Sequence, residues 1–384
     1  KITTEDVKNI LTFVNKKDTA AVDVMIMQDN DTIRPTYLLK RGVYDAPGDK
    51  VRIGLPSAVM PFDSVKYGNN RLGLAKWVTD KRNPLTARVF VNRMWQEFFG
   101  RGLVKTSGDF GMQGEMPSHP ELLDWLALDF MNNGWDIKRL LKQIVMSSTY
   151  RQSTAFTAEK VGADPDNILV ARGPRMRMSA ETIRDMALAS SGLLVKEIGG
   201  PSVKPYQPKG IWESSTSGRG ILARYVQDHG DKLYRRGLYS FIKRTVPPPG
   251  MLVFDASNRD QCEVNRMRTN TPLQALVVLN DPMVLESARV FAERLMQQSS
   301  SPEEKINLAF RSIVCRNPKD AEFDKLVEYY KSEVAAYTAA PGEAKKFIKA
   351  GEYPHVEIQD VVSLAALMQV VHTLYNMDES ITKV

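Results

Sequence analysis

Apolar residues recur at intervals of three and four along most of this chain. Trp95, Phe98 and Phe99 follow this spacing, and so do Leu122, Trp125 and Leu126, so we expect both groups in a core. The pattern predicts helices over 4–15, 70–79, 84–98, 119–132, 136–147, 179–194, 272–279, 282–298, 302–314, 319–337 and 357–377. The chain should therefore be mainly α-helical.

Many of these helices are preceded by a polar capping residue and a proline. The pairs are Asn83-Pro84, Thr271-Pro272, Asp281-Pro282, Ser301-Pro302 and Asn317-Pro318. A polar side chain can accept a free amide of the first turn, and proline has no amide to leave unpaired. Three starts also have the spacing of a capping box: Ser118 with Glu121, Thr271 with Gln274, and Ser301 with Glu304.

Strand patterns are fewer. They cover 22–28, 36–41, 50–53 and the aromatic stretch 237–243, whereas 199–231 is rich in Gly, Ser and Pro and has no helical period. We predict an α+β fold that is predominantly α-helical, with a small N-terminal sheet and a long irregular insertion. The expected domains are an N-terminal segment over 1–80 and a mostly helical domain over 81–384, with its irregular region at about 199–234.

The composition excludes several classes of protein. The 384 residues are 43% hydrophobic and 25% charged, as in an ordinary globular protein, and no apolar run is long enough to span a bilayer. The net charge of +7 is spread among 45 acidic residues, which disfavours a nucleic-acid surface. Only Cys262 and Cys315 are present, without the spacing of a metal site or a haem-attachment motif. Because the chain starts at Lys1 without a signal sequence, we interpret it as part of a longer protein.

Several ordered blocks resemble one known family. They are TYLLKRGVYDAPGDKV (36–51), NPLTARVFVNRMWQEFFGRGLVKTSGDFG (83–111), SHPELLDWLALDFMNNGWDIKRLLKQIVMSSTYRQS (118–153), SAETIRDMAL (179–188), RRGLYSFIKRTVPPP (235–249) and CEVNRMRTNTPLQALVVLNDP (262–282). Together they resemble the PSD1 or DUF1553 domain. That domain ends large envelope proteins of planctomycetes or Bacteroidetes, which often also carry a cytochrome c domain and a DUF1549 domain.

The resemblance implies a context and no reaction. It implies an exported protein, in the periplasm or at the cell surface, that serves glycan use or electron transfer. Its partners would be other domains or subunits of the same envelope assembly. It further implies that any haem c sits on a separate domain, and we expect neither a cofactor nor a metal in this chain.

The segment 260–274 is the first candidate site. Arg266 and Arg268 precede a predicted helix whose free amides can receive an anion such as an anionic glycan. Beside these arginines, the candidate binding residues are Thr269, Asn270, Thr271, Gln274, Tyr206 and Trp212. Alternatively, the arginines pair with Asp255, Asp260 or Glu263 and organise a buried junction.

Catalytic candidates are weaker. Asp109 is a candidate acid, and His119, in the first turn of a predicted helix, is a candidate base. Cys262 has the five-residue spacing to Arg268 of cysteine phosphatases but lacks their glycines. Unpaired carboxylates, Glu115, Asp124, Asp228 and Asp231, have almost no specificity for glycoside cleavage. His229, His355 and His372 are too far apart in sequence for a local metal site, and His372 fits a core position.

A basic run leads into another predicted helix. Arg172, Arg175 and Arg177 precede an acidic first turn at 181–185, which indicates either an electrostatic latch or one wall of a basic cleft shared with Arg266 and Arg268. From all this we predict a non-catalytic binding or scaffolding module. The alternative is a hydrolase acting on anionic or sulfated glycans.

Overall fold

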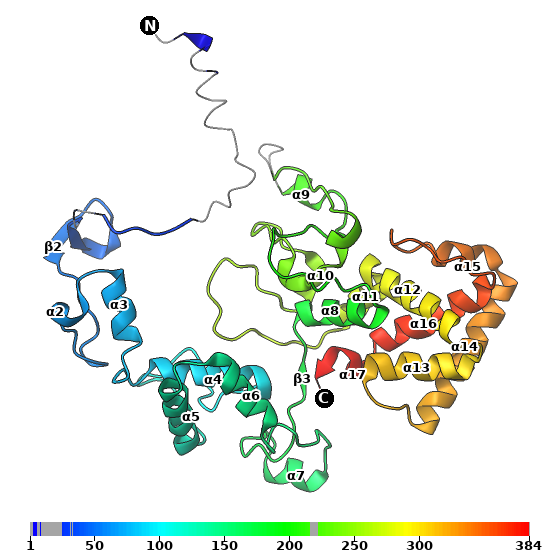
Figure 1. Cartoon of the computed structure of the whole chain (residues 1–384), viewed down its shortest axis with the longest axis horizontal. Coiled ribbons are helices and arrows are strands. Elements are labelled where there is room, and N and C mark those ends of the chain that lie inside the picture. Colours follow the sequence, from blue (N-terminus) through cyan, green and yellow to red (C-terminus); the bar gives the residue numbers. More distant parts are fainter. Residues whose placement is uncertain are drawn as a thin grey trace. The chain divides into compact units, whose positions relative to one another are not determined.

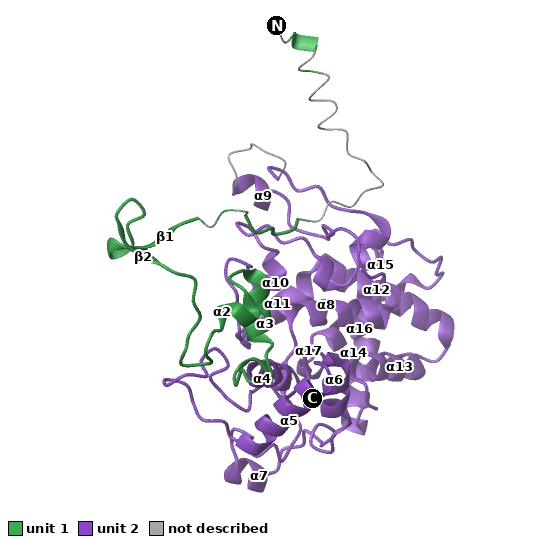
Figure 2. Cartoon of the chain, turned by 60° about the vertical axis from the view of Figure 1, so that its left-hand side comes forward, with its two compact units in different colours: residues 1–87 green, residues 88–384 purple. Residues whose placement is uncertain are grey.

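The computed structural model describes residues 3–5, 8, 25–30, 32, 34–215 and 222–383. The chain divides into two compact units, Lys1–Ala87 and Arg88–Val384, which Figure 2 colours separately. The predicted helix over 4–15 falls largely outside the described residues, and so do the first three residues of the predicted strand over 22–28. Residues 25–28 of that predicted strand are described and form no strand.

The first unit contains a hairpin and two helices. Strand β1 (Thr36–Leu39) pairs antiparallel with β2 (Pro47–Val51), and the 3-10 turn η1 (Lys40–Gly42) lies between them, so the predicted small N-terminal sheet is present. Helices α2 (Ser64–Tyr67) and α3 (Arg71–Val78) follow, capped by the side chains of Asp63 and Asn70. Their small core joins Met60, Tyr67 and Trp77.

The second unit holds most of the helices, labelled in Figure 1. They are α4 (Thr86–Phe99), which begins just before the unit boundary, α5 (Pro120–Asn132), α6 (Ile137–Met146), α7 (Ala158–Ala163), α8 (Ala180–Ser191), α9 (Ile211–Ser214), α10 (Pro249–Val253), α11 (Pro272–Asn280), α12 (Pro282–Gln298), α13 (Pro302–Val314), α14 (Asp320–Ala339), α15 (Pro341–Phe347), α16 (Val361–Tyr375) and α17 (Asp378–Ile381). The 3-10 turns η2 (Gly230–Tyr234) and η3 (Gly237–Tyr239) complete it with two short strands, β3 (Met176–Arg177) and β4 (Thr382–Lys383), which pair antiparallel. The α-rich α+β prediction is confirmed.

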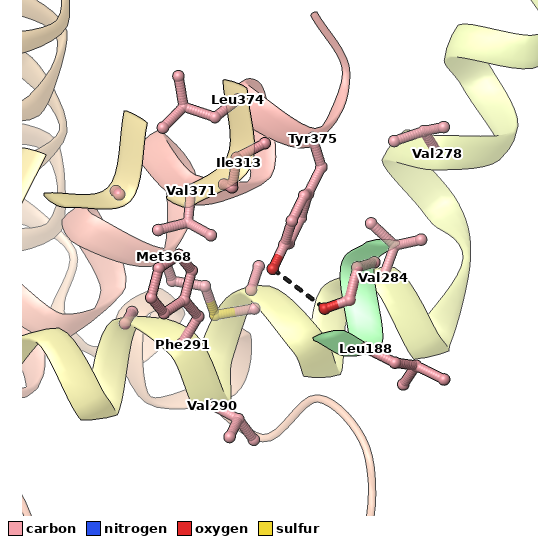
Figure 3. Close-up of a cluster of buried hydrophobic side chains, with 14 of the residues drawn as sticks. Leu188, Val278, Val284, Val290, Phe291, Ile313, Met368, Val371, Leu374 and Tyr375 are labelled. Carbon is pink, nitrogen blue, oxygen red and sulfur yellow. Dashed lines mark hydrogen bonds between the residues drawn. The ribbon is translucent and has the colours of Figure 1, made fainter. Parts of the chain in front are cut away.

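The main core surrounds α12 and α16. Both helices bury residues on nearly every face, and α8, α11, α13 and α14 pack around them. Figure 3 shows part of this cluster, in which Phe291, Met368 and Val371 lie together and the hydroxyl of Tyr375 is hydrogen-bonded. His372 is buried here as predicted, and its Nε2 lies 3.1 Å from the carbonyl oxygen of Val278. Burial lowers the pKa of this imidazole.

A buried ionic group fastens the loop at 350–355 to α12. Arg289 is fully buried; its Nη1 donates to Glu293 Oε1 at 2.7 Å, and its Nε and Nη2 donate to the carbonyls of Ala350 and Tyr353. Glu286 Oε1 accepts the amides of Glu352 and Tyr353, each at 2.7 Å. The preceding Gly351 has φ of 78°, and a Cβ there would meet the Glu286 side chain.

A second core joins α4, α5 and α6. Trp95 and Phe99 are buried in it as predicted, and their rings stack with centroids 4.2 Å apart. The prediction for Trp125 is wrong, because its side chain is 54% exposed. Leu123, Leu126 and Phe130 form the buried face of α5, and Trp125 lies off that face.

The starts of α5 and α14 differ from prediction. Ser118 donates to the carbonyl of Leu103, so α5 takes His119 as its cap and the box with Glu121 does not form. Helix α14 begins at Asp320 instead of beside Pro318, because Glu322 accepts the amide of Lys319 and holds it outside the first turn.

Two further local predictions are corrected. Ser301 caps α13 as expected, but Glu304 accepts from Ser299 Oγ, which leaves that capping box half formed. The predicted strand over 237–243 is instead the turn η3 followed by isolated bridges. The amide of Gly237 donates to Asp185 on α8, which draws the segment onto that helix and away from a sheet.

Candidate ligand pocket

A pocket of about 460 Å³ opens in the second unit. Residues of α8, α10, α11 and α12 and of the irregular segment line it, and its surface is mainly apolar. Five prolines contribute to the walls: Pro205, Pro208, Pro248, Pro249 and Pro282. Its size falls within the roughly 300–1,000 Å³ typical of small-molecule sites. Proline rings lose little conformational entropy on ordering, so such walls keep their shape.

One buried cation lines this pocket. Arg184, on α8, is 8% exposed and donates through Nη2 to the carbonyl of Leu233. Its Nε has no hydrogen-bond partner within the described residues, and none of the ion pairs found there includes it. Burial lowers the pKa of this guanidinium, while the nearby carboxylates of Asp281 and Asp185 act in the opposite direction. A buried charge without an ionic partner is costly, which makes Arg184 a point of attraction for an anion.

An anionic group lines the same pocket. Asp281 caps α12, and its Oδ1 accepts the amide of Met283 at 2.8 Å. Burial raises the pKa of this carboxyl, and the amides of the helix start and the charge of Arg184 oppose that rise. No ion pair within 4 Å joins Asp281 to Arg184 or to any other described residue. Two opposite charges therefore line the pocket without contacting one another.

Further polar side chains line the pocket, among them Tyr206 and Gln207. Tyr206 accepts the amide of Glu352 through its hydroxyl, and burial, with the charge of Glu286 nearby, raises the pKa of the phenol. Nε2 of Gln207 is buried and has no hydrogen-bond partner in the described part of the chain. A few polar groups in an apolar wall are the usual arrangement for orienting a ligand.

The two predicted anion-binding arginines are already paired. Arg266 Nη1 lies 3.0 and 3.1 Å from the two carboxylate oxygens of Glu181 on α8. Arg268 lies 3.6 Å from Glu97 on α4 and also contacts Met176 in β3. Ion pairing was the alternative prediction, but the partners are different acids from those expected. An anion at this place would have to displace these carboxylates.

The rest of that segment is held by Asp255. Its carboxylate accepts both the amide and the hydroxyl of Thr269. Gln274 turns back to the carbonyls of Val253 and Thr269, so its capping box with Thr271 does not form. Asn270, the remaining candidate, is exposed.

The two aromatic candidates lie in different surroundings. Tyr206 lines the pocket, whereas Trp212 on α9 is 1% exposed. The Trp212 ring packs against Tyr225 and Phe241, and Lys243 Nζ lies 4.7 Å from its centre. A sugar could stack on Trp212 only if this packing opened.

Two of the three catalytic candidates, Asp109 and His119, contact local neighbours. Asp109 accepts the amide of Gly111, His119 Nδ1 lies 3.0 Å from Ser118 Oγ, and Cys262 is an exposed thiol. No hydrogen bond among the described residues joins any two of these three. Three of the other carboxylates are paired with cations: Asp124 with Arg88, Glu115 with Lys105, and Asp228 with Lys232.

The predicted arginine latch has a different partner. Arg175 and Arg177 pair with Asp378 at the start of α17, because the pairing of β3 with β4 brings these segments together. Arg172 is buried and donates to backbone carbonyls at 160–165. The acids of α8 pair elsewhere, Glu181 with Arg266 and Asp185 with Arg236.

Sequence reasoning missed Arg184 and Asp281 as site residues. A signal for Arg184 exists: it lies four residues after Ala180 and four before Leu188, and is therefore a charge on the buried face of an amphipathic helix. Asp281 was predicted as a helix cap, and that role is present; its second role as pocket lining depends on the tertiary fold.

The described residues contain neither a metal-binding cluster nor a membrane-spanning helix. No group of three or more His, Cys, Asp or Glu side chains is placed to hold a metal ion there. None of the described helices combines the length and apolarity needed to cross a bilayer.

Comparison with known proteins gives one match. The model of the PSD1 family, described as a protein of unknown function (DUF1553), matches residues 70–330. No curated protein matches the chain. No solved structure matches it either.

Proposed function

This chain belongs to the PSD1 (DUF1553) family, and we propose that it is a non-catalytic ligand-binding module of a larger exported protein. The observation that carries the proposal is the apolar pocket lined by Arg184 and Asp281. The pocket has polar groups that can orient a ligand. In contrast, the predicted acid and base each contact only a local neighbour, and the predicted nucleophile is an exposed thiol, so the geometry favours binding over hydrolysis.

The setting of the module follows from the family resemblance. Proteins with this domain are expected outside the cytoplasm, in assemblies for glycan use or electron transfer, and we place the chain in that context. Other domains or subunits of the assembly would then supply any haem and any catalysis. Recognition of a small molecule by this unit would target or regulate the assembly.

A thermal-shift screen tests the proposal. Purified chain is tested against neutral, sulfated and uronic oligosaccharides and small apolar acids, amines and amino acids, with product analysis for every hit. A ligand at 100 times its Kd raises stability by about 2.7 kcal/mol, which is a measurable change in Tm. Stabilisation without turnover supports a binding module, while turnover of a glycan would establish the hydrolase instead.

A matched pair of variants locates the ligand. Gly250 and Gly342 both follow the first proline of a helix, α10 and α15, but only Gly250 lines the pocket. A Cβ at Gly250 makes ordinary contacts of 3.5 Å with Asp281 and Val277, and one at Gly342 meets open space. G250L should therefore abolish stabilisation by the ligand, and G342L should not. Equal responses in the two variants would place the ligand elsewhere.

A further inference from the structure

The pocket holds a complementary pair of charges in a mainly apolar wall. A cation, Arg184, and an anion, Asp281, line the same cavity with no ion pair between them. Each is held by backbone: Arg184 donates to the carbonyl of Leu233, and Asp281 accepts the amide of Met283. Their positions are therefore fixed by the fold before any ligand arrives.

A ligand with only one charge satisfies only one of these groups. A carboxylate can pair with Arg184 in a forked hydrogen bond, but it then adds negative charge to a cavity that already holds Asp281. A lone ammonium pairs with Asp281 and adds positive charge beside Arg184. A zwitterion pairs with both and leaves the net charge of the cavity unchanged.

The rest of the cavity selects an apolar body. The walls include the apolar side chains of Ile183, Met251, Phe254 and Val277. We propose that this pocket binds a free α-amino acid with an apolar side chain, its carboxylate at Arg184 and its ammonium at Asp281. The inference rests on the proposed binding function, because it names the ligand class of the same pocket.

Three probes with one aromatic body test the charges separately. L-phenylalanine carries both groups, 3-phenylpropanoate lacks the ammonium, and 2-phenylethylamine lacks the carboxylate. Isothermal titration of the full chain should show L-phenylalanine binding at least about tenfold more tightly than either analogue, since a charged hydrogen bond contributes about 1.5–3 kcal/mol. L-leucine and L-methionine are tested beside it to cover other apolar side chains.

Substitutions assign each contact. D281N keeps a good helix cap but removes the charge, so it should abolish the preference for L-phenylalanine over 3-phenylpropanoate. D360N is the matched control, because Asp360 caps α16 in the same way, outside the pocket. R184M should abolish the preference over 2-phenylethylamine. Circular dichroism verifies that each variant is folded. If R184M does not fold, the comparison of D281N with D360N tests the inference by itself.

The outcomes separate this inference from the proposed function. Tighter binding of L-phenylalanine that D281N removes and D360N preserves supports the inference. It is overturned if 3-phenylpropanoate binds as tightly as L-phenylalanine, if the preference survives D281N, or if none of the three amino acids binds. The proposed binding function still stands if another ligand of the screen stabilises the chain and this stabilisation is lost in G250L but kept in G342L. It fails only if no ligand behaves in this way.

Discussion

Replacement of Arg289 by methionine should strongly destabilise the second unit. The guanidinium is fully buried and has four hydrogen-bond partners: Glu293, Nδ1 of His355, and the carbonyls of Ala350 and Tyr353. Methionine matches the aliphatic stem of arginine, so the substitution keeps most of the apolar packing and removes the charge and the donors. Glu293, which is 2% exposed, then remains as a buried carboxylate without its closest partner.

The expected cost follows from these contacts. Removing one partner of a buried ion pair costs about 3–5 kcal/mol, because the remaining charge is uncompensated. At roughly 2–4 °C per kcal/mol for a domain of 150–250 residues, the fall in Tm should be on the order of 6–20 °C. The double variant R289M with E293Q should recover part of this loss, since glutamine leaves no charge buried.

Urea unfolding followed by far-UV circular dichroism measures these differences. The control is R139A, which breaks the exposed pair of Arg139 with Asp129 and should cost less than about 1 kcal/mol. The reasoning is refuted if R289M costs no more than R139A. It is also refuted if adding E293Q makes R289M less stable, because the unpaired carboxylate would then not be the source of the loss.

Three further variants test charges of known environment. Because burial raises the pKa of Asp281, its contribution to stability is complete below the ordinary aspartate range and is lost as pH rises through the raised value. D281N should therefore raise Tm at pH 7 relative to wild type and lose this advantage near pH 4. An advantage that grows on acidification would contradict this reasoning. Arg316 lowers the pKa of Glu322 to about 2, so R316Q should lower Tm at pH 7. The difference in Tm between R316Q and wild type should shrink as pH falls from about 4.3 towards 2. A difference that is independent of pH would exclude the ion pair as its cause. The double variant R266A with R268A should change the free energy of unfolding by less than about 1 kcal/mol per ion pair, because both pairs are partly exposed. If this variant lost a response to sulfated sugars in the thermal-shift screen, an anion site at these residues would be supported after all.

Helix positions were predictable because they depend on local information. The proline starts at Thr271, Asp281 and Ser301 coincide with helices α11, α12 and α13, since a capping side chain and a proline act within one turn. The capping boxes predicted at Ser118 and Thr271 do not form, because they depend on contacts outside the helix. Ser118 and Gln274 found carbonyl acceptors outside their own helices, which no local pattern reveals.

The candidate site was less predictable than the fold. Arginines before a helix start indicate an anion site, but Arg266 and Arg268 are paired with Glu181 and Glu97, which lie about 85 and 170 residues away in sequence. The tertiary fold places Arg268 beside α4 and Arg266 beside α8, and so determines these partners. The pocket itself arises from segments far apart in the chain, so the charges of Arg184 and Asp281 could be recognised singly but not as a pair.

The carboxylate of Glu286 also has a consequence for the exchange of backbone protons with solvent. It accepts the amides of Glu352 and Tyr353, which lie in a loop with no helix or strand. An amide bonded to a fully buried acceptor exchanges with deuterium only when the structure around that acceptor opens. These two loop amides should therefore exchange as slowly as those of α12, and a protection map would group this loop with the most stable part of the molecule.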